Sequence, residues 1–177
     1  MANIVIADAG PLIAFAGIDA LAVLQDLFSE INITESVRRE CLAKPGTDSQ
    51  RIEQAIDQGW LLTSAPGAST PNSAIKPLSP SLGAGESDSI RVALQAPGES
   101  LLIVDDRLAR RVALKQGINI VGTVRLLDLA QQRGLIKSAE LSIAEMTAIG
   151  YRISIGLLET RPYMPTITMP KPRSNRF

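Results

Sequence analysis

The chain has 177 residues, no histidine, one cysteine, and 18 basic residues against 18 acidic ones. Without histidine it cannot use Ser-His-Asp or Cys-His catalysis or a histidine-based zinc site, and Cys41 has no partner for an internal disulfide. The zero net charge argues against a protein that coats nucleic acid through an overall positive field. No apolar run approaches the roughly 20 residues that span a bilayer, and the N-terminus lacks a secretory pattern. We therefore expect a cytoplasmic protein without membrane contact.

The length fits one domain with a short appendage. We expect a domain over residues 1–150 and a basic, Pro-rich C-terminal extension over 151–177. Residues 150–177 hold five basic residues against one glutamate, a charge of +4 that leaves −4 for the rest. The prolines after residue 160 predict an extended or disordered tail, with a short helix over 153–158. A Ser- and Pro-rich stretch over 64–81 predicts a long loop.

The first apolar run, residues 4–7, predicts a buried strand that ends in a turn at Gly10-Pro11. Asp8 then lies at the carboxyl end of this strand. In a parallel sheet that end faces the ligand crevice, which makes Asp8 a candidate for chemistry. Aspartate is also a favoured helix N-cap, so this residue alone leaves both roles open.

Strands and helices are expected to alternate along the rest of the domain. Helices are predicted at 18–28, from an N-cap at Thr34 through Cys41, at 48–58, from an opening at 81–88, and at 107–116, 124–133 and 138–149; strands are predicted at 31–33, 60–63, 101–104 and 118–121. Cys41 and Trp60 are interpreted as core residues. The pattern predicts a three-layer α/β/α fold with a central, mostly parallel twisted sheet.

Two predicted helices carry acids on their apolar faces. Glu40 follows Val37 by three positions on the inner face, although a surface glutamate paired with an arginine is the simpler alternative. Glu86 shares a face with the apolar residues of its helix, whereas Asp88 is rotated from it by roughly 200°. Asp88 is more simply explained as a charge that stabilises the helix N-terminus, so it is the weaker candidate for a metal ligand.

A second acidic site follows the strand at 101–104. Asp105 and Asp106 lie between this strand and the next helix. One of them is expected to N-cap that helix, which would leave the other free to point into the crevice. The outer face of the helix is expected to carry Arg107, Arg110 and Arg111, which are candidates for nucleic-acid contacts.

Acids from two strand ends and two helices converge in such a fold. Close carboxylates repel one another unless they are protonated or neutralised, so a divalent cation is the economical reason to gather them. All-oxygen ligand sets suit Mg²⁺ or Mn²⁺. Two such ions can activate a water and stabilise the leaving oxygen of a phosphodiester.

The order of these motifs resembles the PIN-like domain family. Residues 4–13 resemble its opening motif and residues 37–40 its second acidic motif. The GAGE motif at residues 83–86, the DDRxAR motif at residues 105–110 and residues 117–127 are similar to a VapC-type branch in bacteria and archaea. The resemblance covers roughly residues 3–135.

The resemblance implies a three-layer PIN-like fold and a Mg²⁺- or Mn²⁺-dependent endoribonuclease, the toxin of a type II VapBC-like toxin–antitoxin pair. It implies RNA and a cognate antitoxin protein as partners, and it allows a homodimer. The catalytic and metal-binding positions that it carries over are Asp8, Glu40, Glu86, Asp105 and Asp106. Many relatives have Ser or Thr before the final acid, where this chain has Val104 and Asp105, so the resemblance does not decide between the two aspartates.

Three other functional hypotheses compete with the endoribonuclease. A PIN-like module that binds RNA or protein without cutting would keep the fold and lack activity. A Mg²⁺-dependent phosphatase resembling the haloacid dehalogenase family would need a second aspartate two residues after Asp8, where this chain has Gly10. A response-regulator receiver domain would have its acidic pair after the first strand rather than at Asp105-Asp106.

Overall fold

A computed structural model describes residues 4–64 and 78–152 of the chain. The strands are β1 (Ile4–Ala7), β2 (Ile31–Thr34), β3 (Leu61–Ser64), β4 (Ser100–Ile103) and β5 (Asn119–Val121). The helices of the described ranges are α1 (Ala9–Gly17), α2 (Leu21–Phe28), α3 (Glu35–Cys41), α4 (Thr47–Asp57), α5 (Ala84–Gln95), α6 (Arg107–Lys115), α7 (Thr123–Gln132) and α8 (Ala139–Ala148). None of these helices is both long and apolar enough to cross a bilayer.

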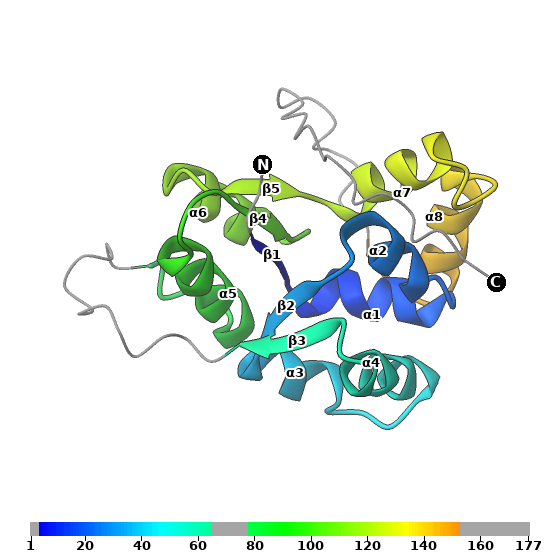
Figure 1. Ribbon diagram of the computed structural model, residues 1–177, viewed down its shortest axis with the longest axis horizontal. Helices are drawn as coiled ribbons and strands as arrows, with labels where there is room; N and C mark the ends of the chain where they lie inside the picture. The colour runs from blue at the N-terminus through cyan, green and yellow to red at the C-terminus, as the bar shows by residue number, and fades with distance from the viewer. Residues whose placement is uncertain (1–3, 65–77, 153–177) are drawn as a thin grey trace, which may run out of the picture.

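The strands form one parallel sheet that separates two groups of helices (Figure 1). Because successive side chains of a strand point to opposite faces, β1 contributes to both sides of the core. Ile6 packs in the cluster that contains Ile90 of α5, and Ala7 packs in the cluster that contains Phe15 of α1. The predicted three-layer α/β/α fold with a parallel sheet is therefore confirmed.

The strand order, β3-β2-β1-β4-β5, puts the two acid-bearing strand ends next to each other. The chain builds the sheet from β1 toward β3 and then crosses to the other side of β1 to add β4 and β5. Ala7 is in register with Ile103, and the Asp8 N–H donates to the Ile103 carbonyl at 2.9 Å. The crevice at such a reversal of strand order is where open α/β sheets bind ligands.

The prediction of a turn after Asp8 is wrong, because α1 begins directly at Ala9. Pro11 lies in the first turn of α1, where its missing N–H leaves no helical hydrogen bond unmade. The helix expected at 18–28 begins only at Leu21, as α2, because Ile18 caps the end of α1 and Asp19 has a left-handed φ of 58°. Cys41 and Trp60 are buried, as expected for core residues. The interpretations of residues 65–77, of 153–158 and of the basic tail fall outside the described residues.

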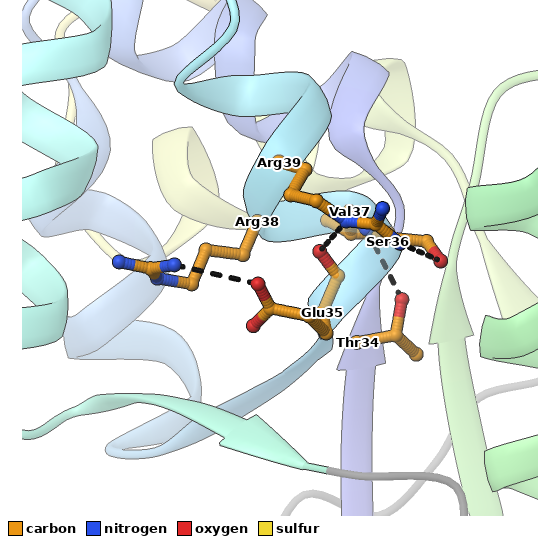
Figure 2. A network of polar contacts seen from close by, with 6 residues as sticks. All are labelled: Thr34, Glu35, Ser36, Val37, Arg38 and Arg39. Atoms are coloured by element: carbon orange, nitrogen blue, oxygen red, sulfur yellow. Dashed lines mark hydrogen bonds and ion pairs between the residues drawn. The ribbon is translucent and has the colours of Figure 1, made fainter.

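The start of α3 is fixed by the expected N-cap (Figure 2). The Thr34 hydroxyl accepts a hydrogen bond from the Val37 N–H at 3.2 Å, and Arg38 pairs with Glu35 at 3.4 Å on the exposed side. Thr34 ends β2 and is fully buried, so the cap joins the sheet to the helix that carries Glu40.

Replacement of Thr34 by alanine should therefore destabilise the protein by about 1 kcal/mol or more, because α3 loses its capping acceptor. Urea unfolding measures the change. Thr34→Ser, which keeps the hydroxyl, should lose clearly less, and equal losses in the two variants would show that the buried methyl group matters and the cap does not.

Candidate active site

A cleft of about 340 Å³ opens at the carboxyl ends of β1 and β4, and all five acids expected from the sequence line it. They come from the end of β1, from α3, from α5 and from the connection between β4 and α6. The residues that line the cleft are Asp8, Gly10, Pro11, Glu40, Glu86, Asp105, Asp106, Arg107, Tyr151 and Arg152. The weaker candidate, Asp88, is not among them.

Asp8 is the most buried acid of the cleft, with 8% of its surface exposed. It occupies the N-cap position of α1, but its side chain makes no capping hydrogen bond. Burial is the main reason that the pKa of Asp8 rises to about 7, and the charges of Glu86, Glu40 and Asp106 add to the rise, while the Ala9 amide opposes it. Apart from the Ala9 amide, the surroundings of the Asp8 carboxylate include three other negative charges.

Glu40 and Asp8 both lie close to Gly85 of α5. If Gly85 carried a Cβ atom, it would lie 3.3 Å from Glu40 Oε2, 3.5 Å from Asp8 Oδ1 and 3.2 Å from a methyl group of Val37. The start of α5 can therefore approach both carboxylates because residue 85 has no side chain. Glu40 is exposed in the cleft and shows no ion pair within the described ranges. This supports the inner-face interpretation over the surface pairing.

Glu86 sits in the first turn of α5 and is half-buried. Its Oε2 atom accepts the Gly83 N–H at 2.8 Å, which fixes the side chain beside the cleft. Burial is the main cause that raises the pKa of Glu86; the Gly83 hydrogen bond opposes this, and the charges of Asp106 and Glu40 add to it. Asp88, two residues later, instead accepts hydrogen bonds from Ser36 of α3 and Arg91, and so ties α5 to α3.

The two adjacent aspartates have different tasks. Asp106 caps α6, as expected for one of them, because its Oδ1 accepts the Ala109 N–H at 2.8 Å. The expectation that the other carboxylate is free is wrong. Asp105 accepts hydrogen bonds from the Thr123 N–H at 2.8 Å, from the Thr123 hydroxyl and from the Tyr151 hydroxyl at 2.6 Å.

The three arginines of α6 do not share one exposed face. Arg107 lines the cleft and Arg111 is exposed, but Arg110 turns inward, where its NH1 atom donates to the Val104 carbonyl at 3.0 Å. Burial lowers the pKa of Arg110, and the charge of Asp105 counteracts the effect. The candidate role of Arg110 in nucleic-acid contact stays a prediction, and this inward hydrogen bond does not favour it. Its guanidinium stabilises the connection between β4 and α6.

The sequence did not single out three residues that belong to the site. Tyr151 and Arg152 line the cleft although they follow the last helix, and Thr123 holds Asp105 from the start of α7. Thr123 is the first residue of α7, and no local pattern links Tyr151 to an aspartate 46 residues earlier. Only the fold brings these side chains together.

A family model for DUF3368, described as a PIN domain, matches residues 4–161. The chain belongs to the PIN domain family. PIN domains are generally nucleases, so this one is a nuclease-like module of the hydrolases that act on nucleic acids. Neither the curated proteins nor the solved structures include a match to the chain.

The acids of this PIN domain have the chemistry of ligands for a hard cation. Carboxylate oxygens are the donors that Mg²⁺ and Mn²⁺ prefer, and the cleft gathers them against their mutual repulsion. Among residues 4–64 and 78–152, no three acidic or thiol side chains already form a ligand set. Glu86 and Asp106 each give one oxygen to a backbone N–H, so their other oxygens are the ones left for a cation.

The raised pKa of Asp8 predicts a pH-dependent stability in metal-free buffer. From about pH 4 to pH 7 the unfolded chain releases a proton that folded Asp8 retains, so stability falls as pH rises and levels off above pH 7. Asp8→Asn removes this loss. Urea unfolding with EDTA should find the variant more stable than wild type by ~2–4 kcal/mol at pH 8, and the difference should nearly vanish at pH 4. A difference that is the same at both pH values would contradict the assignment.

Proposed function

We propose that this PIN domain is a Mg²⁺- or Mn²⁺-dependent endoribonuclease that hydrolyses RNA phosphodiester bonds. The observation that carries the proposal is the convergence of acids from four separate parts of the fold on one cleft at the reversal of strand order. Burial first, and then repulsion within this cluster, raises the pKa of Asp8 and of Glu86, which costs stability at neutral pH unless a cation compensates it.

Asp8, Glu40, Glu86 and Asp106 would hold the cation. Each of them lines the cleft and keeps at least one carboxylate oxygen that no described hydrogen bond uses. When bound, Mg²⁺ or Mn²⁺ would supply an activated water and stabilisation of the leaving oxygen. In this proposal Asp105, the fifth candidate ligand, has a positioning role, because both of its oxygens already accept hydrogen bonds.

The RNA would be held by cations at the rim of the acidic cleft. Arg107 and Arg152 line the cleft and are exposed, and Arg111 is exposed on the same helix as Arg107. Contacts of this kind bind phosphates without reading sequence, so they would orient the strand rather than choose the cleavage site.

We further propose that the protein is the toxin of a VapBC-like pair. The support for this is the resemblance of the GAGE and DDRxAR motifs to the VapC-type branch. A small antitoxin protein would then be the cognate partner and would block the cleft. The same resemblance allows a homodimer, and the single cysteine and the lack of a secretory pattern favour a cytoplasmic location.

Cleavage of total RNA by the purified protein tests the proposal. Wild type should cut with Mn²⁺ and not with EDTA. Asp8→Asn and Glu86→Gln should each lower the rate by at least about 100-fold, because loss of a ligand exceeds the roughly 10–100-fold cost of losing an outer partner. Mixed RNA avoids the choice of a wrong substrate.

Asp88→Asn is the matched control for Glu86→Gln. Both changes neutralise a carboxylate near the start of α5, but Asp88 lies outside the cleft and contacts Ser36 and Arg91. The control should keep its rate within a few-fold of wild type. Cleavage by Asp8→Asn at the wild-type rate would exclude Asp8 as a ligand, and a wild type that neither cuts nor binds Mn²⁺ would support the non-catalytic binding module instead.

A further inference from the structure

Tyr151 follows the last described helix, yet it reaches the cleft. Its hydroxyl donates to Asp105 Oδ2 at 2.6 Å, and the residue is one of those that line the cleft. Burial, together with the charge of Asp105 and the hydrogen bond to it, raises the pKa of Tyr151, so the phenol keeps its proton and remains a donor. Figure 1 shows α8, which ends just before Tyr151, packed beside α7.

The contacts of Asp105 leave its carboxylate little freedom. Oδ1 accepts the Thr123 N–H at 2.8 Å, and Oδ2 accepts the hydroxyls of Thr123 and Tyr151. A Cβ atom on Gly122 would lie 2.9 Å from Asp105 Oδ1, so the start of α7 approaches Asp105 more closely than a residue with a side chain could. We call the group Asp105, Thr123 and Tyr151 the Asp105 latch. Hydrogen bonds to a carboxylate are about twice as strong as neutral ones, which makes the latch a stiff joint.

The latch connects the two strand ends that carry the acids. The Tyr151 hydroxyl lies 3.3 Å from the position that a Cβ atom of Gly10 would take, and Gly10 follows Asp8 by two residues. On its other side Tyr151 holds Asp105, the residue before Asp106. One phenol therefore contacts the chain next to Asp8 and the chain next to Asp106.

We propose that Tyr151 is a positioning residue: through Asp105 it holds the turn between β4 and α6 so that Asp106 faces the acid cluster. The inference rests on the proposed metal-dependent function. It gives the segment that follows α8 a role in the site. Tyr151 itself touches neither the cation nor the RNA in this proposal.

The test is the affinity for Mn²⁺, measured by calorimetry at a temperature where every variant is folded by circular dichroism. Tyr151→Phe removes only the hydroxyl and should weaken Mn²⁺ binding by about 10-fold, the lower end of the effect of an outer partner. Thr123→Val removes the other hydroxyl donor to Oδ2 and should shift the affinity in the same direction. In RNA cleavage at saturating Mn²⁺, Tyr151→Phe should lower kcat and leave KM unchanged.

Thr147→Val is the matched control. It also removes one hydroxyl hydrogen bond, but that bond lies within α8, on an exposed side, where Thr147 donates to the Ile143 carbonyl at 2.8 Å. Its Mn²⁺ affinity should equal that of wild type. The positioning role is overturned if Tyr151→Phe binds Mn²⁺ as tightly as wild type does, or if Tyr151→Phe and Thr147→Val lose the same amount of Mn²⁺ affinity. The proposed function stands in either case. If wild type does not bind Mn²⁺ at all, the proposed function is overturned together with this inference.

Discussion

Repulsion among carboxylates is the constraint on which the site depends. Asp8 is nearly buried, and this burial, with the like charges of Glu86, Glu40 and Asp106 added to it, raises the pKa of Asp8 to about 7. Without a bound cation this arrangement adds no folding stability, because burial and repulsion both penalise the ionised form of Asp8. A cation bound between the acids would convert this cost into affinity, so the cluster has the character of a binding site and not of a structural core.

The fold meets this constraint with rigid elements. Parallel pairing of β1 with β4 fixes Asp8 against the turn that carries Asp106, and the cap of α3 fixes the helix of Glu40. Gly85 lets α5 come close enough to both Asp8 and Glu40. Acids held on strand ends and helices keep their spacing better than acids on loops do, so the fold can hold these carboxylates close together despite their repulsion.

Much of this arrangement could be predicted from the sequence. The apolar strand that leads to Asp8, the Thr34 cap and the inner-face spacing of Glu40 and Glu86 are local signals, and the structure brings these three acids to one cleft. Local signals also misled where Gly10-Pro11 indicated a turn, because proline is tolerated in the first turn of a helix. The contacts of Asp105 with Thr123 and Tyr151, and the inward turn of Arg110, depend on tertiary packing and leave no trace in local spacing.

The most direct test of the account is the effect of Mn²⁺ on the free energy of unfolding of wild type and of Asp8→Asn. Ligand binding to the folded state alone adds about 2.7 kcal/mol when Mn²⁺ is at 100 times its dissociation constant. The account predicts that Mn²⁺ at this concentration raises the free energy of unfolding of wild type by about this amount and leaves that of Asp8→Asn almost unchanged. Equal stabilisation of both proteins, or of neither, would contradict the claim that the acids gather in order to hold a cation.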